Sequence, residues 1–137
     1  EMCIRDRITS GENEPEPEPE QDINIYVDSG NFTEPYFNFY LDDAGTQLLT
    51  PSSTLNINYK YTFRRLNNVT SHPFYISDTS YNTVSTSNIT LSGDGSSTSG
   101  ITGNETFSIS FTGLNNTDNL YYYCTSHSTM ISNFTLV

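Results

Sequence analysis

Residues 55–64 read Leu-Asn-Ile-Asn-Tyr-Lys-Tyr-Thr-Phe-Arg, with apolar or aromatic side chains at every second position. Successive side chains of a β-strand point to opposite faces of the sheet. The pattern therefore predicts one strand, or two collinear strands, with one face buried and the other exposed. An amphipathic helix would instead repeat its apolar residues every three or four positions.

Shorter stretches with the same period lie on both sides of residues 55–64. They are residues 23–27, 37–41, 74–76, 89–91, 107–111, 120–124 and 134–137. Clusters of Gly, Ser, Asn and Asp separate them, and no apolar set recurs at helical spacing over the length of a helix. We therefore predict an all-β fold: a Greek-key β-sandwich or barrel of about seven to eight strands.

Composition narrows the class of protein. The 137 residues are enough for one domain with a single core. Ten Tyr and eight Phe can build that core although only 34% of the residues are hydrophobic. A net charge of -11, with only five Lys and Arg, argues against nucleic acid and anionic membranes as partners. No apolar run approaches the roughly 20 residues of a membrane span, so we expect no membrane insertion of the domain.

The N-terminal region differs from the rest of the chain. Residues 1–10 are expected to be non-native or disordered, because residues 1–7, Glu-Met-Cys-Ile-Arg-Asp-Arg, do not fit the composition of the later residues. Residues 11–22 alternate Pro and Glu and are expected to form a stiff, acidic spacer. Such a spacer suits a tether to a membrane anchor or another domain, or a disordered tail. The folded domain is then residues 23–137.

One short stretch concentrates side chains that bind soft metals. Residues 120–130 read Leu-Tyr-Tyr-Tyr-Cys-Thr-Ser-His-Ser-Thr-Met and contain Cys124, His127 and Met130. The only other histidine, His72, lies in Ser-His-Pro-Phe at residues 71–74. A thiolate, two imidazoles and a weak thioether together suit a mononuclear electron-transfer copper.

Strand geometry places two of these side chains. If Leu120 and Tyr122 face the core, then Cys124 faces it too, because side chains alternate along the strand. His72 can reach the same end of the sheet from the segment before residues 74–76. Pro73 is expected to hold His72 in an extended conformation.

The two motifs together resemble those of the cupredoxins, the type 1 copper proteins, and in particular the plastocyanin-like small copper domains. The resemblance is carried by His-Pro-Phe, an interval of about fifty residues, an aromatic strand ending in Cys-x-x-His-x-x-Met, and a final short strand. It implies a copper cofactor with His72, Cys124 and His127 as trigonal ligands and Met130 as the axial ligand. Asparagine often follows the first histidine in this family and links the ligand loops, whereas Pro73 occupies that position here.

The resemblance further implies one-electron transfer between redox proteins and no enzymatic reaction. We expect His127 to be the electron entry point, within an apolar or aromatic surface that includes Phe74, Tyr123 or Ile131. The acidic chain should favour partners with a basic docking surface. The tether and the family resemblance favour an extracytoplasmic location, which would be periplasmic, secreted or cell-surface.

Other interpretations of the same residues remain open. Cys124 and Met130 could be packing residues and His72 a loop residue, in which case the chain is a non-catalytic β-sandwich module of a larger extracellular protein. Six Asn-x-Ser/Thr sequons fit such a module, although they arise easily in a chain rich in Asn and Thr. A third possibility is a copper carrier without a redox role. Zinc is less favoured because a thioether is a poor zinc ligand.

Overall fold

The computed structural model describes residues 22–137 and shows an all-β protein, as predicted. Its ten strands form three sheets, more strands than the seven to eight expected, because the stretch at residues 55–64 divides into two strands and Ile131–Asn133 forms a further short strand. The prediction for residues 1–10 and nearly all of the spacer at residues 11–22 lie outside the described residues. The first strand begins at Asp22.

The largest sheet has five strands in the order β2-β1-β4-β7-β6. Strand β1 runs parallel to β4, and the other pairs are antiparallel. Because β4 lies at the centre and alternates buried and half-buried side chains, its inner face supports the core. The strands are β1 (Asp22–Val27), β2 (Phe39–Tyr40), β4 (Lys60–Arg65), β6 (Ile89–Gly93) and β7 (Thr106–Phe111).

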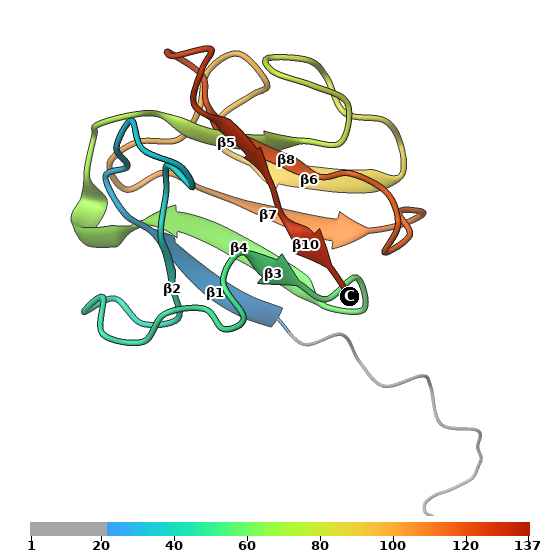
Figure 1. Ribbon diagram of the computed structural model, residues 1–137, viewed down its shortest axis with the longest axis horizontal. Helices are drawn as coiled ribbons and strands as arrows, with labels where there is room; N and C mark the ends of the chain where they lie inside the picture. Colours follow the sequence, from blue (N-terminus) through green and yellow to red (C-terminus); the bar gives the residue numbers. More distant parts are fainter. Residues whose placement is uncertain (1–21) are drawn as a thin grey trace, which may run out of the picture.

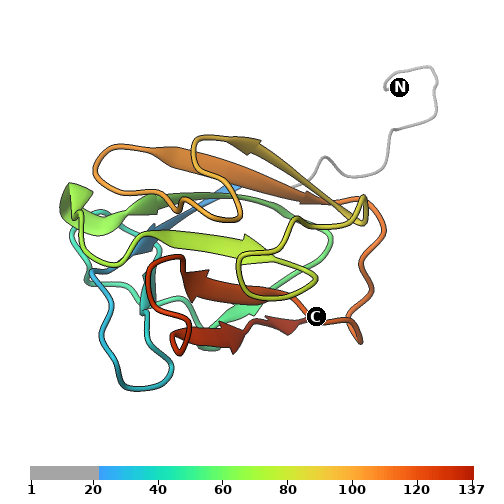
Figure 2. The same ribbon diagram turned by 90° about the horizontal axis from the view of Figure 1, so that it is seen from above.

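Two smaller sheets lie across the core from the five-stranded sheet (Figures 1 and 2). One has the order β5-β8-β9 and is antiparallel, and the other is the parallel pair of β10 and β3. The layers form a sandwich-like arrangement that is not closed as a barrel. The strands are β3 (Thr54–Leu55), β5 (Phe74–Ser77), β8 (Tyr121–Cys124), β9 (Ile131–Asn133) and β10 (Thr135–Leu136).

The alternating stretch at residues 55–64 forms two strands, one of the two predicted alternatives. Strand β3 ends at Leu55 and β4 begins at Lys60, and the two belong to different sheets. The break is a turn around Asn56, whose side-chain Oδ1 accepts a hydrogen bond from the N–H of Asn58 at 2.8 Å and whose carbonyl accepts one from Tyr59 at 3.0 Å. Asparagine side chains favour such turns because they replace a backbone acceptor.

Aromatic rings connect the layers. Phe63 of β4 stacks on Phe107 of β7, with ring centroids 5.4 Å apart, and also contacts Phe74 of β5 at 5.6 Å. Tyr122 of β8 packs against Phe39 of β2 at 5.0 Å. Such pairs add specific geometry to the burial of apolar area. This aromatic core supports the ends of β5 and β8, where the predicted ligands lie.

Candidate metal centre

Cys124 is the last residue of β8 and is fully buried. Strand β8 is the central strand of its sheet, paired with β5 on one side and β9 on the other. Leu120, Tyr122 and Cys124 are all buried, as predicted, and Tyr123 on the opposite face of the strand is buried as well.

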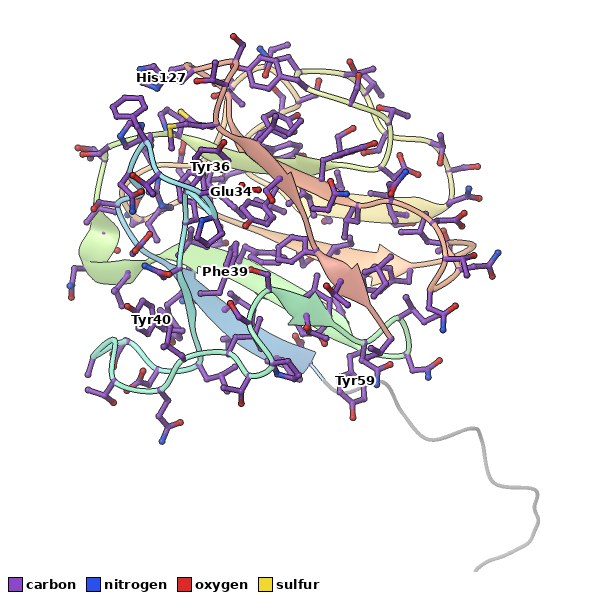
Figure 3. The ribbon with its side chains drawn as sticks, viewed as in Figure 1. Glu34, Tyr36, Phe39, Tyr40, Tyr59 and His127 are labelled. Atoms are coloured by element: carbon purple, nitrogen blue, oxygen red, sulfur yellow. The ribbon has the colours of Figure 1, made fainter. Side chains whose placement is uncertain are left out.

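The segment after Cys124 folds back as a compact loop. The N–H of His127 donates to the carbonyl of Cys124 at 3.3 Å, and the N–H of Met130 donates to the carbonyl of His127 at 3.0 Å. The N–H of Cys124 donates to the carbonyl of Met130 at 3.0 Å and closes the loop. His127 consequently lies at the molecular surface, as Figure 3 shows.

His72 reaches this loop from the turn before β5. Phe74 lies opposite Cys124 in the antiparallel pair, so His72 is two residues beyond the end of the paired region. The N–H of Thr125 donates to the carbonyl of Pro73 at 3.0 Å, which joins the two ligand segments. The turn therefore places the side chain of His72 beside the thiol of Cys124.

The backbone of His72 differs from the prediction. Its φ is +52°, in the left-handed region, and the expected extended conformation is wrong. Pro73 disfavours the right-handed helical region for the preceding residue, and His72 adopts the left-handed region instead of the extended one. A side chain other than glycine has a steric cost there of about 1–2 kcal/mol.

Three of the four predicted ligands come together. The Nδ1 atoms of His72 and His127 are 3.3 Å apart, and the Sγ of Cys124 lies 3.8 Å from the first and 3.3 Å from the second. No other group of His, Cys, Asp and Glu with metal-binding spacing occurs within residues 22–137.

These distances suit a bound metal ion. A point equidistant from the three atoms would lie about 2 Å from each, similar to the roughly 2.0–2.3 Å bonds that imidazole nitrogen and thiolate sulfur make to a metal such as zinc. The donor set of one soft thiolate and two imidazoles suits a late first-row metal rather than Mg²⁺ or Ca²⁺. The group of His72, Cys124 and His127 could therefore hold a metal ion.

Met130, the fourth predicted ligand, is fully buried directly before β9. Its backbone bonds to Cys124 and His127 fix its main chain beside the three other residues. Its role as the axial ligand stays a prediction.

An aromatic side chain that the sequence did not single out covers the two histidines. Phe32 contacts the rings of His72 and His127 edge-on, with centroids 5.0 and 5.1 Å apart, yet 64% of its surface is exposed. Its polar sequence neighbours contain no alternation that would have identified it.

The aromatic surface expected around His127 is wrong in part, because Phe74 and Tyr123 are fully buried.

The surroundings of the site favour neutral ligands before a metal binds. Burial raises the pKa of the Cys124 thiol, and main-chain N–H groups and the charge of Arg65 offset part of that effect. Burial also lowers the pKa of His72, and the neighbouring His127 and Arg65 lower it further. At neutral pH we therefore expect a protonated thiol and a neutral His72.

Metal binding should consequently release a proton. Only the thiolate form of cysteine binds a metal, so Cys124 must lose its proton on binding. Because the pKa of His72 is lowered, its imidazole is already neutral at pH 7 and has no proton to lose. The affinity should rise about tenfold per pH unit between pH 7 and the thiol pKa. Calorimetric titration of a Cys3→Ser chain with Zn(II), in buffers of different ionisation enthalpy, should show about one proton released. Binding without proton release would show that Cys124 is not a ligand.

Comparisons of the chain with protein-family models, curated proteins and solved structures found no match. Within residues 22–137, no helix has the length and hydropathy needed to cross a membrane.

Proposed function

We propose that this chain is a mononuclear copper protein that carries single electrons between redox partners. The observation that carries the proposal is the convergence of the Cys124 Sγ with the Nδ1 atoms of His72 and His127, at separations of 3.3 to 3.8 Å. It agrees with the cupredoxin-like motifs in the sequence. Copper bound to this group would supply a Cu(I)/Cu(II) couple.

Each side chain has a distinct part in this proposal. The thiolate of Cys124 is the soft donor, and the imidazoles of His72 and His127 complete a trigonal set. Met130 is the proposed axial ligand, and its thioether favours copper over zinc. Hydrogen bonds and burial around the sulfur of Cys124 would tune the reduction potential.

The position of His127 suggests how electrons reach the site. His127 lies at the surface while Cys124 is fully buried, so the imidazole is the proposed entry point. Phe32 covers both histidines and presents an exposed aromatic face to a partner. The net charge of -11 favours a partner with a basic surface at low salt. In this proposal the protein catalyses no reaction of a substrate and binds no nucleic acid.

The burial of Cys124 favours a resident ion over a transported one. Although His127 is exposed, Cys124 has no exposed surface, and a buried thiolate limits the access of another protein's ligands to the ion. The Pro- and Glu-rich sequence of residues 11–22 and the resemblance to cupredoxins support the proposal of an extracytoplasmic location, with the domain tethered to a membrane or to other domains.

Visible absorption after addition of one equivalent of Cu(II) to the full chain tests the proposal. We expect an intense thiolate-to-copper band, because Cys124 would donate directly to Cu(II). The band should persist in the matched control Cys3→Ser and disappear in Cys124→Ser. Voltammetry of the wild-type chain should then show one reversible one-electron couple.

Two other results would overturn electron transfer. Absence of both the band and tight copper uptake would favour a non-catalytic β-sandwich module in which Cys124, His72 and Met130 are packing or loop residues. Tight Cu(I) binding without a reversible couple would favour copper carriage.

A further inference from the structure

Arg65, the last residue of β4, is a cation buried in the protein interior. Only 2% of its surface is exposed. Within residues 22–137, every hydrogen bond of its guanidinium ends on a main-chain carbonyl oxygen. The acceptors are Val27 at 3.5 Å, Asp28 at 2.7 Å, Ser71 at 2.8 Å, His72 at 3.1 Å and Ile101 at 3.0 Å.

These bonds join three segments that surround the candidate metal centre. Val27 ends β1 and Asp28 begins the loop that carries Phe32. Ser71 and His72 form the ligand turn, and Ile101 bridges to Phe74 at the start of β5. A guanidinium has five N–H donors in a rigid plane, whereas an ammonium group has three on a flexible chain. Only arginine can serve this set of acceptors at once.

The strained conformation of His72 gives these bonds a local consequence. Left-handed residues other than glycine persist only where the surrounding structure holds them. Here Nη2 of Arg65 donates a hydrogen bond to the carbonyl oxygen of Ser71, and Nη1 donates one to the carbonyl oxygen of His72 itself. The two bonds fix the peptide that precedes His72 and the one that comes after it. They therefore set the direction in which its imidazole leaves the backbone.

We propose that Arg65 is the positioning residue of the metal centre: its guanidinium holds the His72 turn in the geometry that binds copper, and its charge favours Cu(I). The inference rests on the proposed copper function. A buried cation beside the site destabilises the more positive oxidation state because the protein interior screens charge weakly.

Paired substitutions separate the orientation of the His72 turn from the effect of the Arg65 charge on copper. Arg65→Met removes the charge and all five donors, whereas Arg65→Lys keeps the charge and loses the planar fork. Arg64 offers matched controls, because it is the adjacent residue of β4 and bonds to Asn24 and lies over Tyr26 instead. Arg64→Met and Arg64→Lys therefore make the same chemical changes away from the candidate ligands.

Copper affinity and reduction potential are the two measurements. Loss of a partner that orients a ligand typically weakens metal binding by about 10- to 100-fold, and we expect this for both Arg65 variants. Arg65→Met should also lower the Cu(I) to Cu(II) ratio at a fixed potential about tenfold, a shift of about 59 mV. Arg65→Lys should retain the wild-type potential. If each Arg65 variant matches its Arg64 counterpart in both measurements, the proposal is wrong.

A measurement without substitution covers the case in which Arg65 variants do not fold. In nuclear magnetic resonance spectra of the wild-type chain, the guanidinium N–H signals of Arg65 should exchange slowly with water and shift when Cu(I) is added. Those of Arg64 should not shift. Unshifted, rapidly exchanging Arg65 signals in a chain that binds copper would overturn the proposal.

Failure of the copper function would give a different result. The wild-type chain would then lack the thiolate-to-copper band, and the metal-free protein would still report on Arg65. The rings of His72 and His127 lie with their centroids 5.0 Å apart. Nuclear magnetic resonance signals that report this ring contact should be present for the wild-type chain and Arg64→Lys and absent for Arg65→Lys. Ring contacts that survive in Arg65→Lys would show that Arg65 does not position His72.

Discussion

Gly100→Ala is expected to lower the free energy of unfolding by about 3 kcal/mol or more, which is the upper end of the usual cost of overpacking. A Cβ atom at this position would lie 2.5 Å from the nitrogen of Phe74 and 2.6 Å from the carbonyl carbon of Pro73. Both are main-chain atoms, so no side-chain rotation can relieve the clash. The backbone on one side or the other must move.

The location of Gly100 makes that movement consequential for the ligands. Its N–H donates to the side-chain oxygen of Thr125 at 3.0 Å, next to Cys124, and a Cβ atom added to it would meet the main chain of Pro73, next to His72. A displaced Gly100 would therefore push the two ligand segments apart. We expect metal affinity and fold stability to fall together in this variant.

Thermal unfolding of the metal-free chain measures the effect, with Gly103→Ala as the control. Gly103 has φ +63°, but a Cβ atom at this position would meet nothing within 4 Å, so that substitution costs only the left-handed strain of about 1–2 kcal/mol. A midpoint lower by about 10 °C or more is expected for Gly100→Ala. If Gly100→Ala is no less stable than Gly103→Ala, the close approach of Gly100 to Pro73 and Phe74 is wrong.

The fold class was predictable because strand period is a local property of sequence. Alternation identified the positions of β1, β4, β5, β6, β7 and β8 to within a few residues. The prediction allowed two strands at residues 55–64 but did not locate the break between β3 and β4, because Ile57 and Tyr59 continue the alternation through the turn at Asn56. Period alone cannot distinguish a strand from a turn that keeps the same spacing.

The candidate metal centre was predictable to the extent that it depends on residue types. Cysteine and histidine are rare in this chain, and their spacing relative to β8 and β5 brought Cys124, His127 and His72 together as expected. The left-handed backbone of His72 was missed because the rule applied to Pro73 concerns average preference. The turn is determined by contacts with residues distant in the sequence.

The burial of Arg65 and the contacts of Phe32 were not predicted, because both depend on residues that are distant in the sequence. Arg65 occupies a position where the strand pattern continues from Phe63 inward, but a charged residue there was not recognised as buried. Its carbonyl partners Val27 and Ile101 are 38 and 36 residues away. Phe32 meets its histidines only after the loop following β1 folds over them. Neither contact has a local sequence signal.

His72→Gly should weaken metal binding by at least about 100-fold, because removing a ligand costs more than removing a group that only orients one. The same substitution relieves the left-handed strain at φ +52°. His72→Ala removes the ligand equally but keeps the strain. In the metal-free protein, we therefore expect the glycine variant to be more stable than the alanine variant by about 1 kcal/mol.

That order is the reverse of the usual one. Where the backbone is right-handed or extended, alanine is the more stable by about 0.4–1 kcal/mol, because glycine has more conformational entropy to lose on folding. Thr70 is exposed and is not among the positive-φ residues, so Thr70→Ala and Thr70→Gly should show the usual order. Chemical unfolding of the four variants measures both differences. An alanine variant at position 72 as stable as the glycine variant would contradict the left-handed turn, and it would remove the strain that Arg65 is proposed to hold.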